Sequence, residues 1–149
     1  MAASAWLVHD KVKEYMGNKV IDFDSDSFIM ILGLSASNMH TSTTDAYSTV
    51  TSEVATNYDY TQGTKAITSP TWSETTGTVT FDCDDVIWTA NGGSIVARFA
   101  AMYDDTVASP VIDPVICSTL LDTTPLDVTA TDGNAFTIQI HTSGVFTLA

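Results

Sequence analysis

The feature that most constrains this chain is an alternation of side chains between positions 95 and 103. Ile95, Ala97, Phe99, Ala101 and Tyr103 all fall on one side of an extended backbone. Successive side chains of a strand point to opposite faces, whereas a helix repeats its apolar positions every three or four residues. The alternation therefore predicts a β-strand that gives one face to a hydrophobic core.

Other short segments have the same character and are separated by spacers rich in turn-forming residues. The spacers at 91–93 (Asn-Gly-Gly) and 132–134 (Asp-Gly-Asn) supply the positive φ angles that tight connections need. We predict strands at 20–24, 28–34, 65–67, 78–83, 86–89, 94–103, 111–120, 135–141 and 145–148. This series predicts a mostly β fold, a jelly-roll-like β-sandwich or barrel with a short N-terminal helix.

The first 19 residues predict an amphipathic helix or arm. Ser4 can cap a helix, and Gly17 with Asn18 can end it. The apolar stripe of this helix would consist of Leu7, Val8, Val12, Tyr15 and Met16. We therefore divide the chain into an N-terminal helix or arm at 1–19 and a single β domain at 20–149.

Two long segments lack a strand pattern. The first, 35–64, is rich in Ser, Thr, Asn and Asp and contains Tyr47, Tyr58 and Tyr60, and the second is 122–131. Loops of this length in compact domains usually carry function or become ordered against a partner. We expect the longer one to be a contact element.

Charge argues against several kinds of partner. The chain of 149 residues has a formal net charge of −13, and Lys11, Lys13 and Lys19 near its start are three of only five cations. Nucleic acids and anionic membranes attract basic surfaces, so we expect the protein to bind neither. The chain has no apolar stretch approaching the roughly 20 residues that span a bilayer, and no signal-type apolar core. We expect synthesis in the cytoplasm.

An acidic run near the start has part of the spacing of a calcium loop. Asp22, Asp24 and Asp26 occupy its first ligand positions. However, Ser27 stands where that loop needs glycine, and Gly33 where it needs glutamate. We favour an acidic turn between two strands over a calcium site.

No other grouping has the spacing of a catalytic or metal site. Asp82, Asp84 and Asp85 could act as paired carboxylates, but a solvated strand edge is the favoured interpretation. The histidines, at positions 9, 40 and 141, show no metal-binding spacing. Cys83 and Cys117 fit buried thiols better than a disulfide. We expect no enzyme activity, no catalytic residue, no metal and no cofactor.

Several blocks taken together resemble a family of small β-rich virion proteins of tailed bacteriophages. They are IDFDSDS at 21–27, EV at 53–54, YTQGTKAI at 60–67, FDCDDVIW at 81–88, SIVARFAAMYDD at 94–105, AFTIQI at 135–140 and GVFTL at 144–148. The segment 122–127 departs from that pattern as an insertion, and the two cysteines are not expected in it.

The resemblance implies a capsid cement or decoration protein. Such proteins sit as trimers on the outside of the shell and clamp neighbouring major capsid subunits, so the implied partners are the major capsid protein and two further copies of this chain. The implied location is the outer capsid surface of the virion. A positive mean hydropathy of +0.14 is consistent with apolar surface that a trimer would bury. Our candidate assembly contacts are Trp6, Leu7, Val12, Tyr15, Tyr47, Tyr58 and Tyr60.

Two alternatives remain open from the sequence. A head-tail or tail adaptor would share the strands but assemble as a ring or a fibre. A carbohydrate-binding β-sandwich would use aromatic rings as stacking platforms, with Trp72, Trp88, Tyr47, Tyr58 and Tyr60 as its candidates.

Overall fold

The computed structural model describes residues 2–124 and 126–149, and most of their regular structure is strand. The elements in chain order are β1 (Leu7–Val8), α1 (Val12–Gly17), β2 (Phe28–Gly33), the 3-10 helix η1 (Tyr47–Thr49), β3 (Lys65–Ala66), β4 (Thr71–Thr75), β5 (Thr78–Asp82), β6 (Val86–Thr89), β7 (Ile95–Ala97), β8 (Phe99–Asp104), β9 (Val115–Leu120), β10 (Val128–Ala130), β11 (Ala135–Ile138) and β12 (Phe146–Leu148). The predicted mostly β class with a short helix is confirmed.

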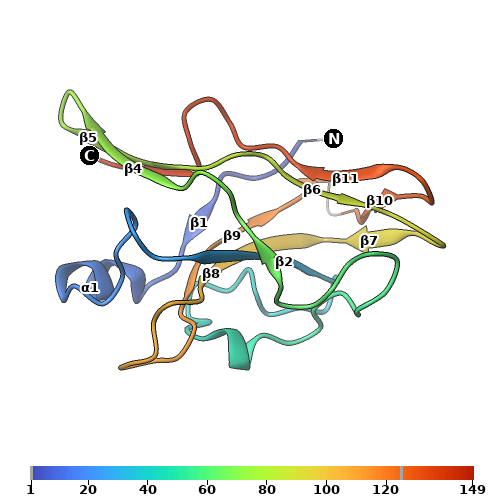
Figure 1. Cartoon of the computed structure of the whole chain (residues 1–149), viewed down its shortest axis with the longest axis horizontal. Coiled ribbons are helices and arrows are strands. Elements are labelled where there is room, and N and C mark those ends of the chain that lie inside the picture. The colour runs from blue at the N-terminus through green and yellow to red at the C-terminus, as the bar shows by residue number, and fades with distance from the viewer. Residues whose placement is uncertain (1, 125) are drawn as a thin grey trace.

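The strands form one larger sheet and three small ones, all antiparallel. The five-stranded sheet has the order β1-β9-β8-β2-β3, and the small sheets are β10-β7, β11-β6 and β12-β5-β4. Figure 1 shows β4, β5, β6 and β11 on one side of the five-stranded sheet and the teal segment 35–64 on the other. No sheet of the described residues closes on itself.

Strand β2 is buried on both of its faces. All six residues of Phe28–Gly33 are buried, which matches the nearly continuous apolar run in the sequence. Phe28, Met30 and Leu32 belong to the main core beneath the small sheets. Ile29 and Ile31 belong to a second core on the opposite face. Each face of the larger sheet therefore has its own hydrophobic cover.

The segment 35–64 forms the cover of the second face. Met39 is completely buried and packs with Ile29, Ile31 and Tyr103. The Tyr47 ring stacks on that of Tyr103, with the centroids 4.4 Å apart. The prediction of a long segment without strands is confirmed, but the segment is a layer of the core and not a free loop.

The prediction of one continuous strand at 94–103 is wrong. The chain forms β7 and β8, which are interrupted at Arg98. The Arg98 backbone N–H donates to the Gly33 carbonyl (2.7 Å), and its carbonyl accepts from the Leu121 N–H (3.0 Å). Arg98 is an extra residue between the two strands and reverses the alternation of side chains. Ile95 and Ala97 therefore face the main core, whereas Phe99, Ala101 and Tyr103 face the second core. Both faces of β8 are apolar, which hid the break.

The prediction of a helix that begins near Ser4 is also wrong. Residues before the helix lie along β9, where Leu7 and Val8 pair with it as β1. Ser4 donates its backbone N–H to the Leu120 carbonyl (2.8 Å), and its Oγ accepts from the Leu120 N–H (3.0 Å). The helix starts at Val12, which is completely buried in the main core. The segment 1–19 thus contributes both a strand and a helix.

Other differences concern shorter elements. The predicted strand at 20–24 is wrong, because this segment leads into a turn. The backbone N–H of Asp22 donates to the Asp26 carboxylate, and that of Asp24 donates to the Asp22 carboxylate. Strands β4 and β10 were missed because Ser, Thr and Glu dominate the first and the second is only three residues long. Their pairing partners, β5 and β7, decide their conformation.

We predict that Met39→Ala destabilises the whole domain. Removing a fully buried methionine typically costs about 2 to 5 kcal/mol, because it leaves a cavity. The measurement is the free energy of unfolding from urea denaturation. Thr51→Ala is the control: Thr51 lies in the same segment with an exposed side chain, so its effect should stay within about 0.5 kcal/mol. Equal stability of both variants and the wild type would show that the segment is not part of the core.

Candidate functional site

A groove of about 1010 Å³ runs between the N-terminal strand and the end of the small sheets. One wall comes from residues 3–6 and Val8, beside Thr119 and Leu121 at the end of β9. The other wall comes from 136–142 and 144–147, which contain most of β11 and β12, and Val128 of β10 also lines the groove. The groove is therefore built by segments from both ends of the chain.

The groove contains no ionised side chain of Asp, Glu, Lys or Arg among its lining residues. Trp6, Phe136 and Ile138 give it apolar surface, with Thr and Ser hydroxyls between them. The strands along it, β1, β11 and β12, each pair on only one side in the described part of the chain. Unpaired strand edges carry free N–H and C=O groups, which an extended segment of a partner can bind.

The N-terminal candidates are divided between surface and core. Trp6 lines the groove, and Leu7 is half-buried in β1. Val12 and Tyr15 are buried in the main core, so their side chains contact this chain itself. The Tyr15 hydroxyl donates to both carboxylate oxygens of Asp45 (3.0 Å each), which attaches the helix to the segment 35–64.

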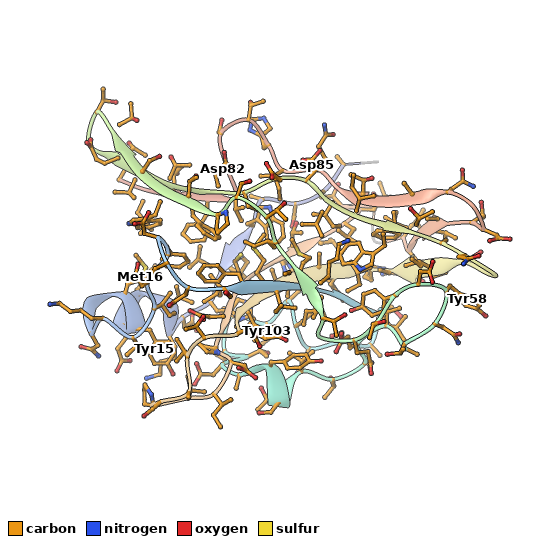
Figure 2. All side chains as sticks on the ribbon, viewed as in Figure 1. Tyr15, Met16, Tyr58, Asp82, Asp85 and Tyr103 are labelled. Atoms are coloured by element: carbon orange, nitrogen blue, oxygen red, sulfur yellow. The ribbon has the colours of Figure 1, made fainter. Side chains whose placement is uncertain are left out.

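The tyrosine candidates differ in how exposed they are. Tyr60 is 1% exposed, and Tyr47 lies half-buried against Tyr103. Tyr58 is 40% exposed and packs beside Gly93, where a β-carbon would collide with its ring. Figure 2 shows Tyr58 at the opposite end of the molecule from Tyr15.

The Glu53 carboxylate binds the hydroxyl groups of both Tyr47 and Tyr60. The Tyr60 hydroxyl donates to Glu53 Oε1 (2.7 Å), and the Tyr47 hydroxyl donates to Oε2 (2.8 Å). The Gly63 N–H also donates to Oε1 (3.0 Å). Burial raises the pKa of both phenols well above the usual value, and the hydrogen bond to Glu53 raises that of Tyr47 further. Both hydroxyl groups therefore remain protonated and act as donors at neutral pH. The cluster ties the segment 35–64 together.

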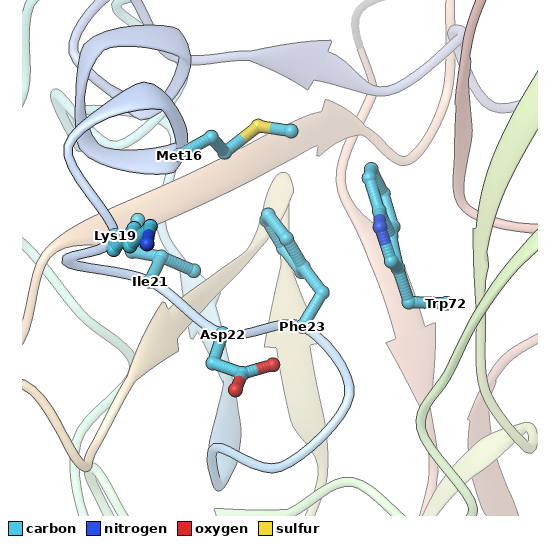
Figure 3. A pocket seen from close by; sticks show the side chains of 6 residues that line it. All are labelled: Met16, Lys19, Ile21, Asp22, Phe23 and Trp72. Atoms are coloured by element: carbon cyan, nitrogen blue, oxygen red, sulfur yellow. The ribbon is translucent and has the colours of Figure 1, made fainter.

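Most of the aromatic rings that could stack on a sugar are covered by other parts of this chain. Trp88 and Tyr60 are buried. Trp72 borders a small pocket of about 300 Å³ with Met16, Lys19, Ile21, Asp22 and Phe23. In Figure 3 its ring faces Phe23, and the two centroids are 4.9 Å apart. One face of Trp72 is thus covered by this chain.

A histidine–serine–histidine network lies where β1, β9 and the segment 35–64 meet. His9 Nδ1 is 2.7 Å from the Thr44 carbonyl, so this nitrogen carries the proton and donates. His9 Nε2 then accepts from Ser118 Oγ (3.0 Å), and His40 Nδ1 donates to the same Oγ (3.1 Å). No pattern of adjacent residues indicates this network, because Ser118 is 109 positions from His9.

This network has the residue types of a nucleophile and its base but not their surroundings. Ser118 is 0% exposed and His9 is 1% exposed, so a substrate cannot reach the hydroxyl. Burial lowers the pKa of both His9 and His40, which keeps both rings neutral at pH 7. We interpret the network as a structural link between layers.

The acidic and thiol candidates form no reactive group. Within residues 2–124 and 126–149, no three side chains of His, Cys, Asp or Glu are close enough to hold a metal ion. Asp84 accepts hydrogen bonds from the hydroxyls of Thr68 (3.0 Å) and Ser69 (2.7 Å). Cys83 and Cys117 are unpaired, and burial raises the pKa of both thiols, that of Cys83 to about 12. Both thiols are therefore protonated at neutral pH and poor nucleophiles.

Asp104 is the most perturbed carboxyl group. Its side chain is completely buried at the end of β8. Burial raises the pKa of Asp104 to about 7, and the neighbouring Asp26 carboxylate adds to the rise.

No family model, no curated protein and no solved structure matches this chain. In the described part of the chain, no helix combines the length and the apolar character that crossing a bilayer would require.

We predict that the histidine network makes stability depend on pH. The pKa of His9 is lower in the folded state than its ordinary value of 6.5, so the unfolded chain binds protons first. The stability that neutral His9 contributes to the folded state is therefore present above pH 6.5 and is lost as the pH falls through the folded-state pKa of His9. Asp104 acts oppositely, since its raised pKa removes stability as the pH rises from about 4 to 7.

The two effects can be separated by comparing variants. The free energy of unfolding of the wild type and of His9→Asn should be measured between pH 5 and 7.5. The difference between them should shrink as the pH falls. His141→Asn is the control, because His141 is exposed and outside the network. A constant difference between wild type and His9→Asn would show that His9 is not bound in its neutral form.

Proposed function

We propose that this chain is a structural virion protein of a tailed bacteriophage, a capsid cement or decoration protein that binds the outside of the major capsid shell and stabilises it. The observation that carries the proposal is a groove lined by no Asp, Glu, Lys or Arg side chain, with free strand edges, on a strongly acidic body. Specific protein interfaces combine a desolvated apolar centre with a polar rim. The sequence resemblance supplies the virion context.

The acidic charge is available to a partner. Among the described residues only two ion pairs form, Lys11 with Glu14 and Arg98 with Asp127, both at 2.7 Å. Most of the 18 Asp and Glu side chains therefore form no ion pair with another described residue. A basic patch on a capsid subunit would complement this surface and would also speed the encounter.

Carboxylates lie close to the groove without lining it. Asp85 accepts a hydrogen bond from the Ile140 backbone N–H (2.8 Å), and Asp82 lies beside Gly144. Figure 2 shows both aspartates on the layer that carries β5 and β6. Asp122 and Asp127 adjoin the lining residues Leu121 and Val128 in sequence, but Asp122 is buried and Asp127 pairs with Arg98. Asp82 and Asp85 thus give the groove an acidic rim on one side, which would select an apolar segment flanked by basic residues.

The proposal includes a jelly-roll-like β-sandwich as the fold. It is supported by antiparallel small sheets that pack over one face of the five-stranded sheet. Among the alternatives, a carbohydrate-binding module is disfavoured because Trp88 and Tyr60 are buried and Trp72 stacks on Phe23. A head-tail or tail adaptor would use the same acidic surface and is distinguished by experiment.

We predict that particles lacking this protein assemble but release their genome at a lower temperature. Many copies, each bound only to the intact shell, add modest gains in stability. Genome release on heating should be compared for particles with and without the protein. The protective effect should weaken in salt, because charges are screened over about 10 Å at 0.1 M ionic strength. Identical release temperatures would reject the clamp and favour the adaptor.

A matched pair of variants tests the groove itself. Ala5→Arg introduces a long charged side chain at an exposed position that lines the groove, whereas Ala135→Arg makes the same change at an exposed position outside it. We expect Ala5→Arg to lower rebinding to stripped particles at least tenfold while Ala135→Arg rebinds like the wild type. Equal rebinding of the two variants would place the contact elsewhere.

We also predict a homotrimer. Large apolar side chains remain exposed in the single chain, at Leu34, Tyr58, Ile87, Ile112 and Leu126. Burying such surface around a threefold axis would stabilise the assembly. Light scattering of the purified protein should give three times the chain mass of 15.9 kDa. A monomer both at micromolar concentration and in the particle would contradict the trimer.

A further inference from the structure

We propose that the carboxylates of Asp26 and Asp104 form a binding site for a divalent cation, with Ca²⁺ as the preferred ion. The site lies where the turn before β2 meets the end of β8. This inference is independent of the proposed virion role.

The first observation is an unpartnered oxygen in the interior. Asp104 is 0% exposed, and its Oδ1 accepts from the backbone N–H groups of Thr106 (2.8 Å) and Val107 (3.3 Å). Its Oδ2 is buried and accepts from no N–H or O–H donor in the described part of the chain, because the side chain that Asp104 faces is another carboxyl group, that of Asp26. An unsatisfied buried carboxylate oxygen costs several times what an ordinary hydrogen bond contributes, so such atoms are rare in folded proteins.

The second observation is what this carboxylate faces. The register of β2 and β8 pairs Phe28 with Asp104, which brings the turn before Phe28 to the end of β8. The Asp26 carboxylate lies within hydrogen-bonding reach of Asp104. Asp26 Oδ2 accepts from the Asp22 N–H (2.7 Å), and neither Asp26 nor Asp104 forms an ion pair with a described Lys or Arg. Two adjacent carboxylates without a cation repel each other.

The chemistry of the pair fits a hard cation. Ca²⁺ accepts six to eight oxygen ligands in flexible geometry, including carboxylates, carbonyls and water. Asp26 is partly exposed, so an ion and its remaining waters can reach the pair from solvent. Mg²⁺ requires near-ideal octahedral geometry and sheds water reluctantly, which two fixed carboxylates do not accommodate well.

The site differs from the calcium loop that the sequence suggested at Asp22, Asp24 and Asp26. Asp22 Oδ1 is occupied by the Asp24 N–H (3.0 Å), so Asp22 and Asp24 hold the turn together. The second ligand comes from Asp104, 78 positions after Asp26 along the chain. With only two carboxylates, the dissociation constant should be on the order of 0.1 to 1 mM.

Thermal unfolding of the full chain at pH 7.5 tests the site, with CaCl₂, MgCl₂ or EDTA added. We expect Ca²⁺ at ten times its dissociation constant to raise the Tm by about 3 to 6 °C, and Mg²⁺ to raise it less. Asp104→Asn, which is isosteric, and Asp26→Asn should both abolish the Ca²⁺ response. Asp24→Asn is the control, because it removes the same charge from the same turn but should keep the response.

Two results would overturn the proposal. The first is a Ca²⁺ response that is equal in Asp104→Asn and the wild type, which would mean general screening of the acidic surface. The second is the absence of any Ca²⁺ response in the wild type. If the Tm of this wild type also falls between pH 6 and 8 while that of Asp104→Asn does not, Asp26 and Asp104 share a proton instead of a metal ion.

Discussion

The burial of β2 on both faces is the constraint on which the rest of the structure depends. Six consecutive residues, Phe28–Gly33, are buried, so the five-stranded sheet needs a cover on each side. The small sheets cover the face of Phe28 and Met30, and the segment 35–64 covers the face of Ile31. Because one backbone supports both cores, the irregular segment is as necessary to the fold as the strands.

Buried polar groups hold these layers in register. Glu53 accepts hydrogen bonds from two tyrosines, and His9 links Thr44 to Ser118 across three elements. Both groups have satisfied hydrogen bonds, which makes them stabilising where unpaired polar groups would be costly. Asp104 is the exception, since one of its oxygens has no partner. The contrast is the reason for assigning a ligand to that carboxylate and only a structural role to the others.

Side chains that are buried in the core of this chain cannot contact a partner, so the core limits which surfaces are available for function. Val12, Tyr15 and Tyr60 are buried, so a partner would meet mainly the groove, its acidic rim and isolated exposed apolar residues. Trp6 is the candidate that the sequence and the groove share. The groove combines apolar side chains with hydroxyl groups, a lining that suits the protein association proposed above.

The sequence by itself determined the mostly β class, most strand positions and the acidic surface, because the period of the strand and the net charge are local or additive properties. Only the tertiary structure decided the break at Arg98, the strand before Val12 and the meeting of His9 with Ser118. It also placed Asp104 beside Asp26. These features depend on which segments far apart in the chain become neighbours, and a pattern of adjacent residues carries no record of that pairing.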